Sequence, residues 1–215
     1  MIGLFQNHKI NIIGNNIMNS KTLIGPTGYW VEEDKKLYHI RCEPLCDWII
    51  NYLKDYKDKQ IYDFGCGNGQ YLCKLQEAGF TKLIGFEADV PKFRDFKDIR
   101  QQDLAVSFDL SEKGNCIFLE VAEHIPAIYE DIVMDNIINA CDDKLIMSWA
   151  YRGQGGHGHI NCRDNNEIIK MATDKGMVFL QEETNSVRNA IPDNDPVRCP
   201  PEILYFKKNV LIFKK

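Results

Sequence analysis

The stretch Lys59–Gly69 constrains the fold of this chain more than any other part of its sequence. Apolar residues lead into an acid, Asp63, and three glycines then occupy alternate positions: Gly65, Gly67 and Gly69. Apolar residues next recur with helical spacing until Gly79, so the pattern predicts a buried strand, a tight turn and a helix. Glycine permits a positive φ and lets a ligand approach the backbone closely. We therefore predict that this turn binds a ligand.

Asp63 indicates which kind of ligand the turn takes. A dinucleotide-binding turn spaces its glycines G-x-G-x-x-G and offers bare N–H groups to phosphate, and Gln70 breaks that spacing. An acid at the end of the strand would repel phosphate but would suit a cation. A second acid, Glu87, ends the next predicted strand, Lys82–Glu87, where a carboxylate can accept hydrogen bonds from ribose hydroxyls.

A further motif, Glu120-Val-Ala-Glu-His-Ile-Pro126, follows another predicted strand. Together with Asp63-x-Gly-x-Gly-x-Gly, it resembles the class I S-adenosylmethionine (SAM)-dependent methyltransferases, and the resemblance covers residues 58–215. It implies a Rossmann-like α/β fold with a doubly wound, mostly parallel seven-stranded sheet and an antiparallel C-terminal strand. It also implies SAM as the cofactor, a ligand with an amino group and a sulfonium and no phosphate.

The same resemblance implies the cofactor contacts. Glu87 would bind the ribose, Asp103 would meet the adenine amino group, and the segment from Glu120 would lie beneath the methionine moiety. The full set of expected cofactor-binding residues is Asp63, Gly65, Cys66, Gly67, Asn68, Gly69, Glu87, Ala88, Asp103, Leu104, Glu120 and Val121.

The rest of the chain alternates predicted strands and helices, which is typical of a parallel, doubly wound sheet. Strands are expected at 99–103, 115–120, 144–150, 177–182 and 209–213, and helices at 44–56, from 126 and at 164–175. We predict two units: an N-terminal extension with a lid-like helix at 1–56, loosely held over 1–25, and a SAM-binding domain at 57–215. Tyr29 and Trp30, in a turn before that helix, are expected to line the acceptor side.

Charge and composition bear on partners and compartment. The chain has 31 acidic and 26 basic residues, a net charge of −5, and no block of Lys and Arg, which makes nucleic acid an unlikely partner. No apolar run reaches the ~18 residues of a membrane span, and the N-terminus lacks the shape of a signal peptide. Eight scattered cysteines without a C-x-x-C pair predict free thiols. We therefore expect a cytoplasmic protein that does not enter a membrane.

The segment Gly153–Asn161 is the most unusual part of the chain, because it places two histidines among glycines. This composition predicts a loop that folds closely over a ligand. With Trp149 before it, the pattern Trp-Ala-x-x-Gly-Gln-Gly-Gly-x-x-His-Ile-Asn also resembles a branch of little-characterised microbial and viral methyltransferases.

Two chemical interpretations compete for the histidines. In the first, His159 or His157, with His124 nearby, is a general base that takes a proton from a substrate hydroxyl. In the second, Glu120, Glu123, His124 and a loop histidine such as His157 bind Mg²⁺, Mn²⁺ or Zn²⁺. The ubiquinone-pathway O-methyltransferases and the small-RNA 3′-terminal 2′-O-methyltransferases use an E-x-x-E-H arrangement of this kind. We favour the metal-free base here, because E-x-x-E-H also occurs in methyltransferases without metal.

The function that we expect is methyl transfer from SAM to an oxygen of a small polar acceptor, with a sugar or glycan hydroxyl as the first choice. One alternative is a metal-dependent 2′-O-methyltransferase that acts on an RNA end. Another is a SAM-binding fold that has lost catalysis and serves as a partner subunit.

Overall fold

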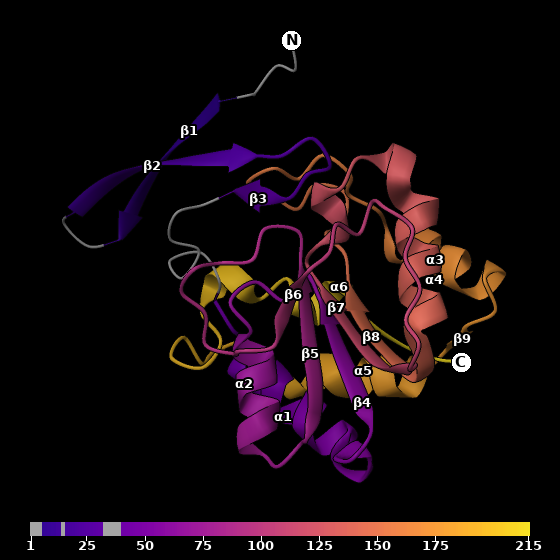
Figure 1. Cartoon of the computed structure of the whole chain (residues 1–215). Coiled ribbons are helices and arrows are strands. Elements are labelled where there is room, and N and C mark those ends of the chain that lie inside the picture. The colour runs from indigo at the N-terminus through magenta and orange to yellow at the C-terminus, as the bar shows by residue number, and fades with distance from the viewer. Residues whose placement is uncertain (1–5, 14–15, 32–39) are drawn as a thin grey trace.

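The computed structural model describes residues 6–13, 16–31 and 40–215, and side chains from residue 24 onward within those ranges (Figure 1). Among these residues, seven strands form one sheet in the order β6-β5-β4-β7-β8-β10-β9. Neighbouring strands from β6 to β8 pair in parallel, and β10 runs antiparallel to both β8 and β9. The strands are β4 (Gln60–Phe64), β5 (Lys82–Glu87), β6 (Ile99–Gln101), β7 (Gly114–Leu119), β8 (Cys141–Ser148), β9 (Val178–Phe179) and β10 (Val210–Lys214). The predicted fold class is confirmed.

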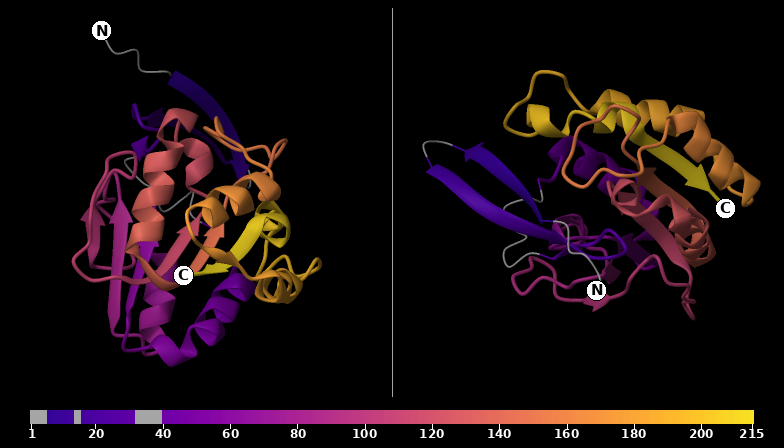
Figure 2. Two further views of the ribbon diagram at one scale, coloured as in Figure 1. Left: turned by 90° about the vertical axis from the view of Figure 1, so that its right-hand side faces the viewer. Right: turned by 90° about the horizontal axis from the view of Figure 1, so that it is seen from above.

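Helices cover both faces of this sheet (Figure 2). Successive strand residues point to opposite faces, so Ile61 of β4 packs into one apolar layer and Tyr62 into the other. The first layer contains α1 (Glu43–Tyr52), α2 (Gln70–Glu77) and α5 (Gln181–Ala190). The second contains α3 (Glu130–Ala140) and α4 (Asn165–Asp174). A short helix, α6 (Phe206–Asn209), leads into β10.

The structure corrects the prediction between residues 177 and 191. The strand expected at 177–182 is limited to β9, and Gln181 begins α5 instead. Only Thr184 and Val187 of α5 are buried, so its apolar stripe is narrow and easily missed in the sequence. By contrast, α4 begins as predicted, because Asp164 and Glu167 form a reciprocal capping box at its N-terminus.

The N-terminal segment forms an antiparallel sheet of its own among the described residues. Its strands, β1 (Gln6–Ile13), β2 (Asn16–Ile24) and β3 (Trp30–Val31), pair in sequence order. Within the described part of residues 1–25, β1 and β2 pair as a hairpin that extends from the rest of the chain (Figure 1). The loosely held extension stays a prediction, and residues 1–5 and 14–15 lie outside the described ranges. In contrast, α1 packs against α2 and α5. None of the helices in the described ranges is long and apolar enough to cross a membrane.

Candidate functional site

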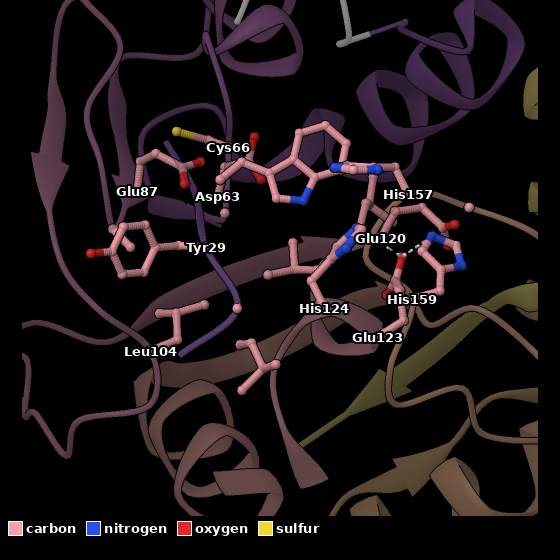
Figure 3. Close-up of a pocket in the computed structure, with 18 of the residues that line it drawn as sticks. Tyr29, Asp63, Cys66, Glu87, Leu104, Glu120, Glu123, His124, His157 and His159 are labelled. Carbon is pink, nitrogen blue, oxygen red and sulfur yellow. Dashed lines mark ion pairs between the residues drawn. The ribbon is translucent and has the colours of Figure 1, made fainter. Parts of the chain in front are cut away.

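A cavity of about 390 Å³ opens where the parallel strands end, beside the glycine turn. Its walls come from the tips of β4, β5 and β7, from the turn before β3 and from the histidine loop (Figure 3). Ligands of open α/β sheets bind at this edge, outside the carboxyl ends of the strands. The cavity is therefore the candidate site.

The glycine turn has the shape that its sequence predicts. Gly65, Gly67 and Gly69 all have a positive φ. A Cβ on Gly65 would lie 2.4 Å from a methyl of Val121, so a larger residue would displace Val121 and would be strained at this positive φ. The backbone N–H of Gly67 donates to the Glu87 carboxylate at 2.8 Å, which joins the turn to the tip of β5.

Asp63 lies at the cavity wall with almost no exposed surface. Its Oδ2 atom has no hydrogen-bond partner within the described structure. Burial, and secondarily the charge of Glu87, raises the pKa of Asp63 to about 8. A buried carboxylate at a ligand cavity without a protein partner fits a cationic group of a ligand.

The third acid, Asp103, is bound to the N-terminal segment. Its carboxylate accepts hydrogen bonds from the Ala105 N–H at 2.9 Å and from the Thr27 hydroxyl at 2.7 Å. Thr27 belongs to the turn Gly25–Trp30, whose Tyr29 and Trp30 both line the cavity. Tyr29 lies beside Glu87 and Leu104, away from the histidines where we expect the acceptor (Figure 3). Ten of the expected cofactor residues line the cavity: Asp63, Gly65, Cys66, Asn68, Glu87, Ala88, Asp103, Leu104, Glu120 and Val121.

Sequence reasoning missed Arg41, although its guanidinium lines the cavity beside the start of α2. It pairs with Glu43 and lies 3.5 Å from the Gln70 carbonyl. Its Nε atom is buried without a hydrogen-bond partner in the described ranges. Arg41 thus places a cation at the cavity wall, and no motif around it in the sequence gives that signal.

Glu120 follows β7 with a φ of 54°, the only positive φ among the non-glycine residues described. Its side chain accepts hydrogen bonds from Gln154 at 2.8 Å and from Asn209 at 2.6 Å. Burial raises its pKa to about 7. Since both oxygens have amide donors, Glu120 joins the histidine loop to the end of α6.

Glu123 and two histidines gather at the other side of the cavity (Figure 3). Oε1 of Glu123 lies 3.8 Å from His124 Nε2 and 3.9 Å from His159 Nε2. Burial, with the charge of Glu120 second, raises the pKa of Glu123 well above its ordinary value. His157 lies across from this group, with its ring 5.6 Å from the Trp30 ring. All three predicted catalytic histidines thus line the cavity.

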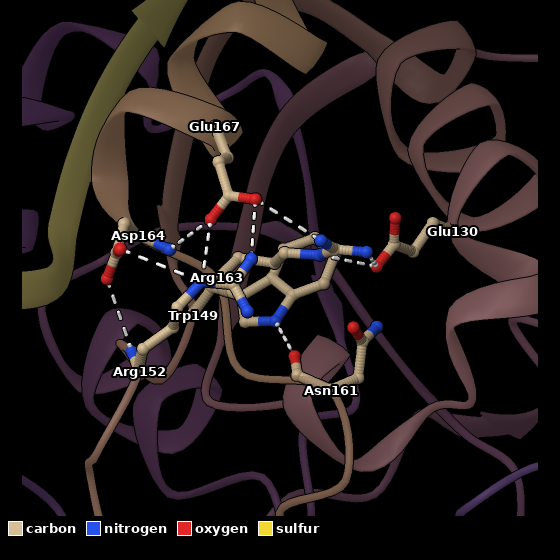
Figure 4. Close-up of polar contacts among 7 residues, drawn as sticks. All are labelled: Glu130, Trp149, Arg152, Asn161, Arg163, Asp164 and Glu167. Carbon is tan, nitrogen blue, oxygen red and sulfur yellow. Dashed lines mark hydrogen bonds and ion pairs between the residues drawn. The ribbon is translucent and has the colours of Figure 1, made fainter.

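The histidine loop, Gly153–Asn161, is held in place by main-chain and side-chain hydrogen bonds. The N–H groups of Ile160 and Asn161 donate to the Glu123 carbonyl at 2.9 and 3.0 Å. The Asn161 amide donates to the Ile125 carbonyl at 3.1 Å, and the Trp149 indole donates to the Asn161 carbonyl at 2.6 Å (Figure 4). In the Trp-Ala-x-x-Gly-Gln-Gly-Gly-x-x-His-Ile-Asn pattern, Trp149 and Asn161 therefore hold the loop in place through these hydrogen bonds.

An ion-pair network supports the far side of the same loop (Figure 4). Arg163 bonds to Glu130 at 2.8 Å and to Glu167 at 3.2 Å, and Arg152 bonds to Glu167 at 2.6 Å. The loop is therefore fixed at both ends, while its histidines face the cavity.

This fold is that of the class I (Rossmann-like) SAM-dependent methyltransferases, as solved structures show. The magnesium protoporphyrin IX methyltransferase of Synechocystis PCC 6803, crystallised with SAH, matches 80% of this chain and 81% of its own, with 17% identity and a TM-score of 0.52. The methyltransferase domain of bacterial CtHen1-C matches 80% and 96%, with 16% identity and a TM-score of 0.53. The Burkholderia thailandensis 1,6-didemethyltoxoflavin-N1-methyltransferase, solved with its acceptor and S-adenosylhomocysteine, matches 81% and 77%, with 11% identity and a TM-score of 0.55.

Curated relatives are more specific in name but match less of the chain. The tRNA U34 carboxymethyltransferase of Helicobacter acinonychis is 32% identical over 120 residues, 47% of this chain and 45% of that protein. The protein of the same name from Campylobacter hominis is 42% identical over 51 residues, 22% of this chain and 18% of that protein. The chain spans less than half the length of the curated relatives it matches. No protein-family profile matches it.

Proposed function

We propose that this chain is a SAM-dependent methyltransferase that transfers a methyl group to a hydroxyl oxygen of a polar acceptor. The observation that carries the proposal is the pair Asp63 and Glu87 at the glycine turn: one carboxylate is buried with an oxygen that lacks a partner, and the other is fixed on the turn. Solved structures of the same fold contain SAM or SAH.

The cavity offers a complementary group for each charged or polar part of SAM. Asp63 would hold the cationic methionine end, Glu87 the ribose hydroxyls and Asp103 the adenine amino group. We add Arg41 as the partner of the methionine carboxylate, because its guanidinium lines the cavity next to the start of α2. Charge-assisted contacts of this kind are the stronger class of hydrogen bond.

Methyl transfer fits this cavity better than the carboxymethyl transfer named for the curated relatives. A carboxymethyl donor would bring a second carboxylate into the cavity. Among the described lining residues the only Lys or Arg is Arg41, which we assign to the methionine carboxylate. Glu120 and Glu123 place two acids at the acceptor side, which offers no Lys or Arg among the described lining residues to a second carboxylate.

The acceptor class that we propose is a small polar molecule with a hydroxyl, a sugar or glycan first. The histidines of the cavity are placed to assist loss of the hydroxyl proton. The names of the curated relatives support a second candidate, an RNA acceptor, against which the net charge of −5 argues. Incubation with labelled SAM and separate pools of sugars, glycans and tRNA distinguishes these acceptors.

Calorimetry tests cofactor binding directly. SAM and S-adenosylhomocysteine should bind, and NAD should not. Asp63→Ala and Glu87→Ala should each weaken SAM binding by about 1.5–3 kcal/mol, the contribution of a hydrogen bond to a charged group. Asp89→Ala, two residues beyond Glu87 and outside the cavity lining, is the matched control and should bind SAM like the parent chain.

Binding of NAD without binding of SAM would refute the proposal. Binding of SAM with no transfer to any pool would favour the non-catalytic partner subunit.

A further inference from the structure

Cys42 and Cys199 bring two thiols into contact although they lie 157 positions apart in the sequence. Their Sγ atoms are 3.5 Å apart, and both cysteines are free. Both are buried, with 0% and 2% of their surface exposed. A disulfide holds its two sulfurs ~2.05 Å apart, so an approach of roughly 1.5 Å would allow a bond between them.

The residues next to the two cysteines already hold the two parts of the chain together. The N–H of Glu43 donates to the Arg198 carbonyl at 3.0 Å, and Arg198 forms an ion pair with Asp47 of α1. Because each cysteine is a direct neighbour of one of these bonded residues, the sulfurs can meet without a large movement of the backbone.

Each cysteine belongs to a segment that forms part of the cavity wall. In segment 40–42, Ile40 and Arg41 line the cavity, and the Cys42 N–H donates to the hydroxyl of Tyr71, another lining residue, at 3.3 Å. Segment 199–206 begins with Cys199 and contains four lining residues: Glu202, Ile203, Tyr205 and Phe206. A bond between the two cysteines would therefore join one part of the wall to another.

Burial of the thiols determines how such a bond can form. It raises the pKa of the Cys42 thiol to about 12, so little of the reactive thiolate is present while the two segments are packed together. An oxidant reaches the sulfurs only when the segments separate locally. A ligand that fills the cavity and contacts both segments would oppose this separation, and oxidation would then be slower.

We propose that Cys42 and Cys199 form a reversible disulfide that fastens segment 40–42 to segment 199–206 and keeps this wall of the cavity closed. The oxidant is a small disulfide such as oxidised glutathione. The thiolate of one cysteine displaces one glutathione and forms a mixed disulfide, and the other cysteine then displaces the second glutathione. The two cysteines lose two electrons and two protons, and the two glutathione thiols that are released take them up.

The disulfide adds regulation to the proposed function, and this part of the inference rests on that function. Segment 40–42 carries Arg41, which we assign to the methionine carboxylate of SAM. When the wall cannot open, ligands enter and leave the cavity more slowly, and release of product limits turnover in many enzymes. Oxidation should therefore slow the release of S-adenosylhomocysteine, and reduction should restore it.

Peptide mapping of the full chain tests the bond without reference to activity. The chain is incubated with oxidised glutathione, its remaining thiols are alkylated, and the peptides are analysed by mass spectrometry without reductant. A Cys42–Cys199 linked pair should appear, and dithiothreitol should remove it. Cys42→Ala and Cys199→Ala should each abolish the pair. Cys46→Ala, one turn further along α1 and also buried, is the matched control and should keep it.

The oxidised chain should melt about 4–16 °C higher than the reduced chain, because the bond closes a long loop. It should also release labelled S-adenosylhomocysteine more slowly. Absence of the linked pair in the oxidised parent chain, or equal release rates from the two forms, would overturn the inference. Mapping of the parent chain decides the first point even if an alanine variant unfolds. Failure of the reduced chain to bind SAM or S-adenosylhomocysteine would refute the proposed function instead, and the mapping would still test the bond.

Discussion

Asp63 illustrates how a residue that we propose binds SAM can destabilise the chain that carries it. Its pKa rises from 3.8 to about 8 on folding, chiefly through burial, so the folded chain retains a proton that the unfolded chain loses above pH 4. The contribution of Asp63 to the free energy of unfolding is therefore most favourable in acid. It declines as the pH rises from about 4 to about 8.

Asp63→Asn should remove this pH dependence. The variant should be more stable than the parent chain at pH 8, and the difference should shrink toward pH 5, as urea denaturation at several pH values would measure. SAM affinity should fall at the same time, because the amide cannot supply the charge. Equal stability of the two chains at every pH would contradict the burial of an unpaired carboxyl.

The residues that sequence reasoning found and those that it missed differ in how far apart their partners lie in the chain. Asp63 and Glu87 sit in local motifs, a strand followed by glycines and a strand followed by a turn. The Thr27–Asp103 and Glu120–Asn209 hydrogen bonds join residues 76 and 89 positions apart. The spacing of residues along the sequence does not predict hydrogen bonds between such distant positions. Arg41 was missed because a single cation does not form a recognisable sequence motif.

At the scale of elements, most strands and helices follow from apolar periodicity and cap residues, whereas α5 does not. Its sequence contains mainly polar residues, and its helical form depends on packing against β10 and α1. The ligand turns were predictable because parallel strands bring their carboxyl ends to one edge. Which histidines lie beside Glu123 was not predictable from the sequence, because this depends on how the histidine loop folds back on the Glu123 segment.

Asn161 should be critical for that loop. Asn161→Ala leaves the Ile125 carbonyl without its amide donor, and loss of such a buried bond costs about 1–3 kcal/mol. Because His159 lies two residues away, turnover should fall more than SAM affinity. Thermal denaturation and steady-state kinetics would measure both effects. Asn166→Ala, exposed on α4, is the matched control and should change neither; similar losses in both variants would argue against the role of Asn161.

At the scale of the whole molecule, the N-terminal hairpin leads into the turn Gly25–Trp30, which lines the cavity. β1 pairs with β2, and only the end of β2 pairs with β3. Removal of residues 1–22 keeps Leu23 and Ile24, the partners of β3, and should leave SAM affinity unchanged in calorimetry. A large loss of SAM affinity in the shortened chain would show that the hairpin contacts the cofactor.

The turn Gly25–Trp30 touches both ends of the cavity: Thr27 bonds to Asp103, and the Trp30 ring packs edge-on against His124 at 5.1 Å and near His157. Gly28 lies against the His124 backbone so closely that a Cβ would be 1.9 Å from its carbonyl oxygen. One segment therefore contacts both the side of the cavity that we assign to SAM and the side that we assign to the acceptor. We expect an ordered kinetic mechanism in which SAM enters first and S-adenosylhomocysteine leaves last. S-adenosylhomocysteine should then inhibit competitively against SAM and noncompetitively against the acceptor. A random-order inhibition pattern would mean that the turn opens at each end independently.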